Sequence, residues 1–270
     1  TADIPFSVFK PSGIASETLL EKIQLGMSLT DDEEEEFQAT KDRFNKIAKA
    51  CFDSDVQLYI DSEDSFYQDP IDEICYELME RYNKEKVYIF NTYQMYRVGM
   101  LENLRKANET AKTKGYKVGA KLVRGAYMEK ERERAGEKGY PDPIMPDKEA
   151  TDSQYDEALV YCIENLDNME LCSGTHNEQS NYLLVDLIEK HKLPKDDKRI
   201  FFAQLFGMSD HISFNLANSG YNVVKYVPFG PVGTVMPYLL RRAEENTSIA
   251  GQSSRELELI RKELRRRKGK

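Results

Sequence analysis

Seven short segments rich in β-branched, aliphatic and aromatic residues alternate with longer, more polar segments along this chain. The short segments predict β-strands and the longer ones predict helices. Such an alternation is typical of a parallel sheet, because parallel neighbours need a long crossover connection, usually a helix. The seven predicted strands are residues 4–10, 56–61, 86–91, 117–123, 169–173, 199–205 and 222–227.

A helix is predicted after each of these strands. The clearest helix start follows Thr30, because threonine is a good N-cap and the acidic run after it suits a first helical turn. Gly115 marks an equally clear helix end. The helices are predicted up to about residue 23, at 30–50, 70–83, about 97–114, 128–139, 153–165 and 178–190, after Gly207, and in the second half of 225–248.

The length of 270 residues suits one large domain, since α/β barrels of about 250 residues are commonly single domains. We therefore predict an α/β fold, a (βα)8 TIM-like barrel, over residues 1–254, followed by a basic helical tail at 255–270. The tail either touches anionic lipid or is a solvated helix end whose charge suits the C-terminal dipole.

The composition argues against several classes of protein. A net charge of −9 argues against nucleic-acid binding by the surface as a whole. No apolar run approaches the roughly 18 residues of a membrane span, and the first residues lack the features of a signal peptide. Four cysteines without a CxxC pair favour reduced, mostly buried thiols in an intracellular protein. Three dispersed histidines favour no zinc site, so no metal is predicted.

Polar or aromatic residues stand at the ends of most predicted strands. In a (βα)8 barrel the carboxyl ends of all strands meet on one face, where active sites lie. Neither a GxGxxG nor a GxxxxGK[ST] motif occurs, so the usual dinucleotide fingerprint and the P-loop are both missing. The strand-end residues are Lys10, Asp61, Asn91, residues 121–127, His176, Asn177, Leu205 and Tyr226.

The last predicted helix carries two adjacent arginines. Pro237 is tolerated in its first turn, where a backbone donor has no partner anyway. Arg241 and Arg242 form a fork that suits a carboxylate or a phosphate. The alternative is an ordinary amphipathic helix with a solvated charged side. At helical spacing, one face holds Met236, Leu239, Leu240 and Ala243, and the opposite face holds Tyr238, Arg241, Arg242 and Glu245.

Several long motifs of this chain resemble those of the FAD-dependent proline dehydrogenases. They are KLVRGAY at 121–127 followed by MEKERERA, then THNE at 175–178, KYVPFGPV at 225–232 and YLLRRAEEN at 238–246. The similarity runs from about residue 8 to residue 248. It is densest in the mitochondrial-type branch, where GAKLVRGAY and FNTYQ look similar.

The resemblance implies oxidation of L-proline to Δ1-pyrroline-5-carboxylate, with hydride passing to FAD and electrons to ubiquinone or menaquinone. Arg241, Arg242 and Lys10 would then clamp the substrate carboxylate, and Glu245 would hold the guanidiniums. Asp61 matches the acidic residue of the pocket, either as a base or as an ordering group. The pocket around the proline ring would be formed by Tyr127, Leu205, Tyr226 and Tyr238.

The resemblance also implies how the chain holds the flavin. Lys121 and Arg124 would lie near the isoalloxazine and the pyrophosphate, where positive charge stabilises a reduced anion. Gly125 and Ala126 would allow a close backbone approach. The remaining positions that match cofactor contacts are Asn91, Thr175, His176 and Asn177.

The chain departs from the family pattern at its start. The family has a strand before the one that matches residues 4–10, and residues 1–5 leave no room for it. The barrel is therefore expected without its first strand. The resemblance implies peripheral membrane contact, at the matrix side of the mitochondrial inner membrane in a eukaryote or at the cytoplasmic side of the inner membrane in a bacterium. The alternatives are a hydroxyproline dehydrogenase, another enzyme on the same flavin barrel such as a methylenetetrahydrofolate reductase, and an inactive barrel fragment that acts only in association.

Overall fold

In a computed structural model, the described part of the chain is residues 4–233, 235, 236, 238–240 and 261–268. These residues form one parallel sheet in which the seven strands follow one another in sequence order. The strands are β1 (Phe6–Phe9), β2 (Gln57–Ile60), β3 (Ile89–Gln94), β4 (Val118–Val123), β5 (Met169–Gly174), β6 (Ile200–Leu205) and β7 (Val223–Tyr226). This order of parallel strands is that of a half-barrel, and all seven predicted strands are confirmed.

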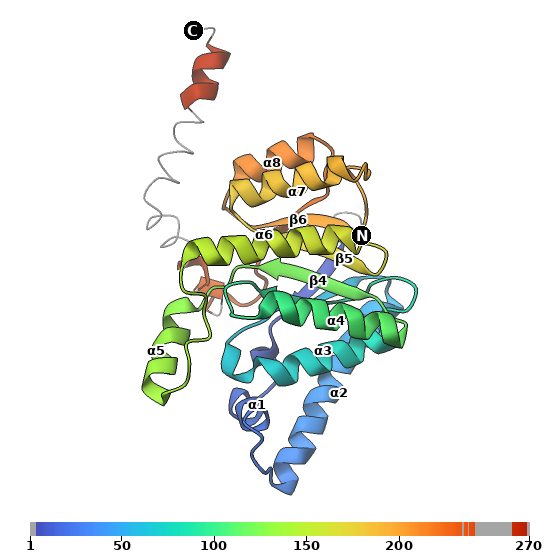
Figure 1. The fold of residues 1–270 in the computed structure, drawn as a ribbon, viewed down its shortest axis with the longest axis vertical. Helices are drawn as coiled ribbons and strands as arrows, with labels where there is room; N and C mark the ends of the chain where they lie inside the picture. Colours follow the sequence, from blue (N-terminus) through green and yellow to red (C-terminus); the bar gives the residue numbers. More distant parts are fainter. Residues whose placement is uncertain (1–3, 234, 237, 241–260, 269–270) are drawn as a thin grey trace.

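Helices connect the strands and cover the outer face of the sheet. In Figure 1, α3, α4, α6, α7 and α8 follow one another across the view in chain order, and α5 stands apart from them. The helices are α1 (Glu17–Gln24), α2 (Asp31–Asp53), α3 (Gln68–Tyr82), α4 (Met100–Lys114), α5 (Met128–Lys138), α6 (Lys148–Glu164), α7 (Glu178–Lys190) and α8 (Asp210–Asn218), with short 3-10 helices at Pro11–Gly13 and Ser65–Tyr67.

Side-chain N-caps explain where four of the helices α1 to α8 begin, namely α1, α2, α6 and α7. Thr30 accepts a hydrogen bond from the Glu33 amide, and the Glu33 side chain accepts one from the Thr30 amide, so the predicted cap of α2 is a complete capping box. Helix α6 starts five residues earlier than predicted. Its N-cap is Asp147, which accepts from the Ala150 amide at 2.7 Å. Three prolines precede Asp147 closely, at 141, 143 and 146, and proline is unfavourable inside a helix, so the sequence pattern predicts a later start.

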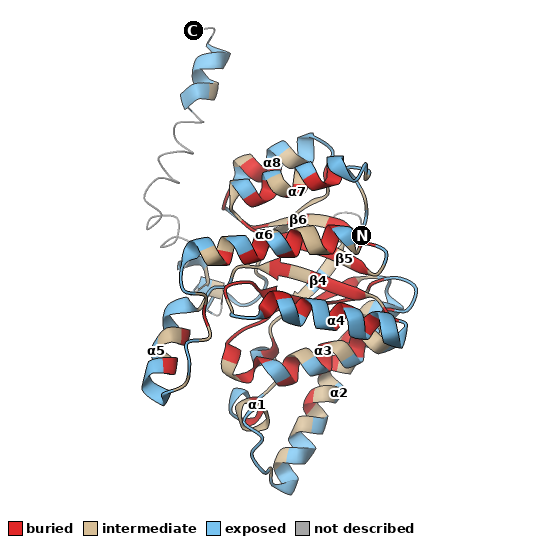
Figure 2. Cartoon of the chain, in the orientation of Figure 1, coloured by how far each residue is buried: buried red, intermediate tan, exposed pale blue. Residues whose placement is uncertain are grey.

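Two hydrophobic layers hold the sheet. The large outer core packs strand residues such as Leu58 and Leu122 against helix residues such as Leu104 and Leu159. Figure 2 shows the resulting pattern, with buried residues on the sheet-facing sides of the helices. A smaller cluster fills the inner face of the half-barrel. It consists of Tyr59, Val87, Phe90 and Cys172, with Phe6, Val8, Phe201 and Ala203 packed against them.

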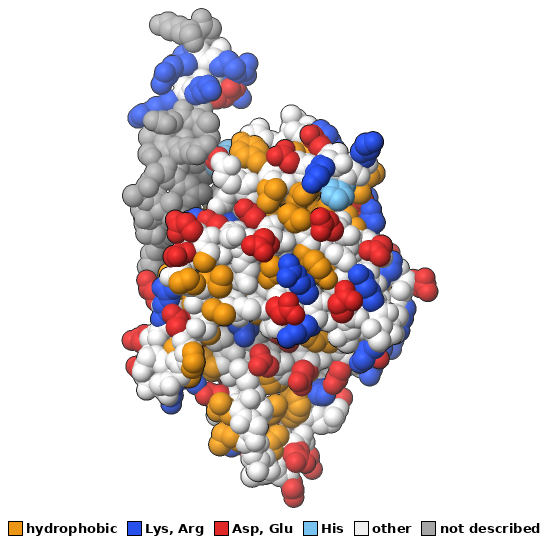
Figure 3. All heavy atoms as spheres, viewed as in Figure 1, with side chains coloured by type: hydrophobic (Ala, Val, Ile, Leu, Met, Phe, Trp, Pro, Cys, Tyr) orange, Lys and Arg blue, Asp and Glu red, His pale blue; other side chains and the backbone are white. Residues whose placement is uncertain are grey.

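On the face in Figure 3, lysine and arginine side chains are interspersed with aspartate and glutamate. No helix within the described ranges is long and apolar enough to cross a membrane. All four cysteines are free, and Cys75, Cys162 and Cys172 are buried, as predicted for reduced thiols. Residues 261–267 of the predicted tail are helical. The division into a barrel and a tail stays a prediction.

Candidate functional site

The pleat of the strands decides which strand-end side chains face the inside of the half-barrel. Side chains alternate between the two faces of a strand, and the inner cluster marks the inner positions. Lys121 pairs in register with the inner Cys172, and Tyr226 pairs with Leu205. By the same alternation, five predicted site residues share the inner face at the carboxyl ends of their strands. They are Lys10, Asp61, Lys121, Leu205 and Tyr226.

Asp61 lies between two lysines at this inner face. Lys121 Nζ donates to Asp61 Oδ1 at 2.5 Å, and Lys10 Nζ lies 3.7 Å from Asp61 Oδ2. The side chains of Asp61 and Lys121 are 11% and 12% exposed, whereas that of Lys10 is 40% exposed. Two cations therefore share the Asp61 carboxylate, and Lys10 is the more exposed of the two. Such an arrangement can attract and orient an anionic ligand.

The electrostatics keep Lys10 protonated. Burial disfavours its charged form, but the charge of Asp61, together with Tyr127, Glu63 and Tyr226, outweighs this and raises the pKa of Lys10 to about 12. Two tyrosines lie close by. Lys121 Nζ is 5.6 Å from the centre of the Tyr226 ring, and the rings of Tyr226 and Tyr238 are 6.0 Å apart. Burial and the charge of Asp61 raise the pKa of Tyr226 to about 12, so its hydroxyl stays neutral.

Tyr127 belongs to the same neighbourhood. It precedes α5 as the helix cap position, is half-buried, and contributes to the raised pKa of Lys10. The structure therefore brings together the side chains predicted for the pocket as far as they are described, namely Lys10, Asp61, Tyr127, Leu205, Tyr226 and Tyr238.

Asn91 lies on the other face of the sheet. It is paired in register with Ile60 and Ala120, which belong to the outer core, and its amide donates to Asp72 of α3 at 2.9 Å. Because Asn91 faces the outer helices, its position does not support a contact with a ligand bound at the inner face of the half-barrel. Gln94, three residues later, is the last residue of β3. It lies on the same face of the strand as Phe90, which belongs to the inner cluster. Alternation along β3 places Asn91 and Gln94 on opposite faces, so the sequence could have offered Gln94 as the alternative to Asn91.

Gln94 has one amide atom still available. Its Nε2 donates to the Glu63 carbonyl oxygen at 2.9 Å, but its Oε1 is buried and has no hydrogen-bond partner among the described residues. A buried acceptor without a donor is costly in a folded protein. The atom is thus a candidate contact for a bound molecule that carries a hydrogen-bond donor.

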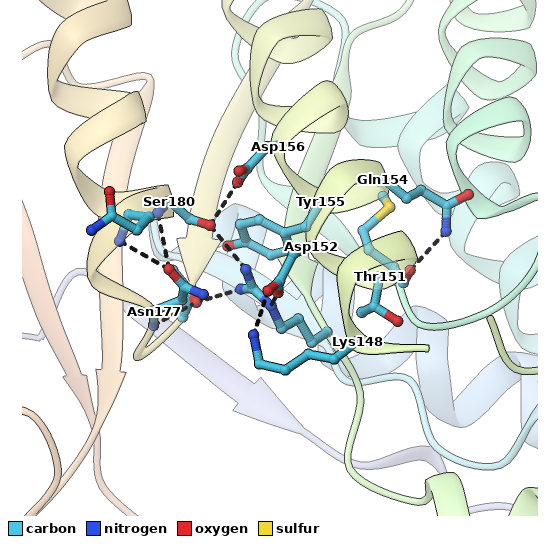
Figure 4. A network of polar contacts seen from close by, with 12 residues as sticks. Lys148, Thr151, Asp152, Gln154, Tyr155, Asp156, Asn177 and Ser180 are labelled. Carbon is cyan, nitrogen blue, oxygen red and sulfur yellow. Dashed lines mark hydrogen bonds and ion pairs between the residues drawn. The ribbon is translucent and has the colours of Figure 1, made fainter. Parts of the chain in front are cut away.

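Arg124 follows β4 directly and its side chain lies on the outer side of the sheet, against α6 and α7. Its Nε donates to Asp152 at 2.6 Å, its Nη1 to Thr175 at 2.7 Å and its Nη2 to Ser180 at 2.9 Å. The guanidinium also stacks on the Tyr155 ring, 4.3 Å from its centre. Figure 4 shows these side chains of α6 and α7 converging on one spot. Sequence reasoning missed the partners of Arg124 on the two helices.

The other predicted cofactor positions follow either Arg124 or its partner Thr175 in the chain. The Thr175 hydroxyl also accepts from the Asn177 amide at 3.0 Å, and Asn177 caps α7. His176 Nδ1 lies 3.0 Å from Ser209 Oγ. Gly125 has a φ of +135°, and the Tyr96 ring occupies the space that a Cβ would need, so the backbone approach at this glycine is to Tyr96. Ala126, like Gly125, is exposed.

Of the three residues predicted to clamp the substrate carboxylate, the described part of the chain includes Lys10. Arg241, Arg242 and Glu245 lie outside the described residues. The described residues of the same helix have Tyr238 half-buried toward Tyr226, while Met236 and Leu240 are 41% and 55% exposed. Among these residues, the side with Tyr238 is the one that faces the site.

Comparison with known proteins gives a consistent picture. The family model described as proline dehydrogenase matches residues 6–255. Proline dehydrogenase 1, mitochondrial, of Drosophila melanogaster is 41% identical over 248 residues, which are 87% of this chain and 36% of that protein. The human protein of the same name is 42% identical over 240 residues, 87% of this chain and 40% of its own length.

A solved structure shares the fold. Proline utilization A (PutA) of Bdellovibrio bacteriovorus, inactivated by N-propargylglycine, superposes with a TM-score of 0.79 at 24% identity, over 90% of this chain and 24% of that one. The likeness confirms that the half-barrel is of the TIM-barrel type. This chain spans about two fifths of the length of the two mitochondrial relatives and a quarter of PutA.

Proposed function

This chain belongs to the proline dehydrogenase family, and from that premise we propose that it takes part in the oxidation of L-proline to Δ1-pyrroline-5-carboxylate with FAD as the hydride acceptor. The observation that carries the proposal is the Lys10–Asp61–Lys121 group beneath Tyr226 and Tyr238. It offers positive charge for a carboxylate and a small, partly aromatic space for a ring.

The reaction removes a hydride from the ring carbon beside nitrogen and a proton from nitrogen. In our proposal Lys10 binds the substrate carboxylate, together with Arg241 and Arg242, and Glu245 holds the two guanidiniums. Asp61 already accepts from Lys121 and faces Lys10, so we assign it to ordering these lysines rather than to proton transfer. The amine proton then passes to water. Leu205, Tyr127, Tyr226 and Tyr238 limit the space around the ring.

The inner face fits a flavin. The buried Gln94 Oε1 lacks a donor among the described residues, and the flavin ring carries an N–H group that could supply one. Lys121 lies on the same inner face, where its charge would stabilise a reduced, anionic flavin. A bound flavin supplies the two-electron acceptor. We therefore propose Gln94 and Lys121 as flavin contacts, with Gln94 in place of Asn91.

The outer contacts have less direct support. Arg124, Thr175, His176 and Asn177 surround the ends of β4 and β5, and we propose that the exposed backbone at Gly125 and Ala126 beside them meets the more polar part of FAD. We further propose that a quinone reoxidises the flavin, with peripheral membrane contact. A mitochondrial location at the matrix side of the inner membrane is proposed from the names of the relatives.

A visible spectrum tests the proposal. The purified chain, supplied with FAD and passed through a desalting column, is expected to keep flavin absorption bands that bleach under anaerobic conditions when L-proline is added. Ubiquinone or menaquinone should then restore them. D-proline serves as the control. A chain that retains FAD without bleaching would contradict the proline reaction, and a chain that retains no FAD would favour an inactive barrel fragment.

A further inference from the structure

A buried acidic loop carries Asp61. Residues 61–65, with the sequence DSEDS, run from the end of β2 to the first residue of the 3-10 helix Ser65–Tyr67, and each is at most 8% exposed. Its side chains are tied to distant segments. Glu63 accepts from both the amide and the hydroxyl of Ser12 at 2.8 Å, and Ser62 donates to the Thr92 carbonyl oxygen. The position of Asp61 therefore depends on how the whole loop is held.

Helix α5 contributes two of these ties. Its Lys130 donates to Asp64 at 2.6 Å. Its Glu131 is completely buried and accepts two hydrogen bonds from Ser65, one from the amide and one from the hydroxyl, both at 2.5 Å. Otherwise α5 buries only Ala135, and Figure 2 shows a helix that is exposed over most of its length. A buried carboxylate on such a helix needs a reason, because its desolvation is costly.

We propose that Glu131 is a positioning residue, which holds the acidic loop so that Asp61 stays between Lys10 and Lys121. The inference rests on the proposed function and adds a residue to it. Glu131 of α5 lies four residues after Tyr127, which precedes the helix, and Ser65 lies four residues after Asp61 on the loop. The contact thus joins the two segments that border the site. Glu131 itself is hydrogen-bonded to Ser65 of the loop and not to Lys10, Asp61 or Lys121.

The test compares Glu131→Gln with Glu133→Gln in the flavin-loaded chain. The glutamine keeps the size of the side chain but removes its charge and one of its two acceptor oxygens. Glu133 is an exposed neighbour on the same helix and serves as the matched control. We expect Glu131→Gln to raise the KM for L-proline and the Kd for L-tetrahydrofuran-2-carboxylate together, by about five- to tenfold, with kcat within about twofold. The control should leave all three unchanged.

A purely structural role would give a different result. In that case Glu131→Gln would lower the yield or the Tm, while the folded fraction kept the wild-type KM and Kd, and the proposal would be overturned. Ser65→Ala, which removes one of the two donors, should reproduce part of the KM change. The double variant should change KM by less than the product of the single effects, because both remove the same contact.

The proposed function and this inference can fail separately. If the wild-type chain does not oxidise L-proline, the function is refuted, and hydrogen exchange of the amides of residues 61–65 still decides the role of Glu131. Exchange should be about tenfold faster in Glu131→Gln than in Glu133→Gln. Equal exchange in the two variants would overturn the positioning role.

Discussion

Lys121 and Arg124 stand three residues apart in one motif, yet they serve two different regions of the molecule. Lys121 is on the inner face of the half-barrel, where it shares Asp61 with Lys10 beneath an aromatic ring. Arg124 is on the outer side, where Asp152, Thr175, Ser180 and Tyr155 surround its guanidinium.

The difference shows which cation is free to act on a ligand. The inner group has two cations for one carboxylate and an open side at Lys10. In the outer group Asp152 is also shared by two cations, and its pKa is lowered because hydrogen bonds from Lys148 and Arg124 outweigh the effect of burial. The difference is that Arg124 already donates from all three of its nitrogens, to Asp152, Thr175 and Ser180. A cation that is partly exposed to solvent is suited to binding, whereas a cation with several fixed hydrogen bonds is suited to holding β4, β5, α6 and α7 together.

The largest expected effect is on the inner cation. Lys121→Ala should lower kcat/KM for L-proline by about 10²–10³-fold, because it removes a charge aimed at the site. Its unfolding midpoint in urea should stay close to that of the wild type, since Asp61 keeps Lys10. Lys114→Ala is the control, because Lys114 pairs with Glu80 on the surface. If kcat/KM of Lys121→Ala stayed within threefold of the wild-type value, the distinction between the inner and the outer region would be contradicted.

The outer cation should affect stability instead. Arg124→Lys retains the charge but cannot donate in three directions from one planar group, and we expect a loss of about 1–3 kcal/mol in the free energy of unfolding. Urea unfolding measures it. Arg105→Lys is the control, since Arg105 is exposed and stacks on Tyr161. A stable Arg124→Lys variant with a raised KM would assign Arg124 to the ligand.

Tyr226 tests the space at the inner face. Tyr226→Ser should raise kcat/KM for trans-4-hydroxy-L-proline relative to L-proline by about tenfold, because the smaller side chain leaves room for the hydroxyl. Tyr182→Ser, at an exposed position of α7, should leave the ratio unchanged. An unchanged ratio in Tyr226→Ser would place the substrate away from this ring.

The smallest effect concerns the outer layer near Asn91. Burial raises the pKa of Asp72 to about 6, although hydrogen bonds from Gln68 and Asn91 oppose the shift. The folded state therefore binds the proton more tightly than the unfolded state, and stability falls as pH rises from about 4 to about 6.

Asp72→Asn removes this fall. Above pH 6 the variant should be more stable than the wild type by about 1–2 kcal/mol, measured by urea unfolding at pH 4.5 and 7. Because Asp72 and Asn91 are on the outer face, the KM for L-proline should not change. A change in the KM for L-proline would contradict this and would indicate that Asn91 acts on the substrate or the flavin.

The order of strands and helices was predictable because it depends on neighbouring residues. The seven apolar segments, the cap at Thr30 and the stop at Gly115 are local signals, and each appears in the structure close to its predicted place. The strand-end positions of Lys10, Asp61 and Tyr226 followed from the same segments. The motif at 121–127 indicated two important cations through its resemblance to a family.

Only the tertiary structure decided what these side chains meet. Whether Asn91 or Gln94 faces inward depends on the pairing register of β3 with β2 and β4. The separation of Lys121 from Arg124 depends on where β4 ends and on the approach of α6 and α7. The contact of Glu131 with Ser65 joins segments 66 residues apart. Periodicity and capping act between neighbours in the chain, whereas the partner of a buried charge is set by packing between distant segments.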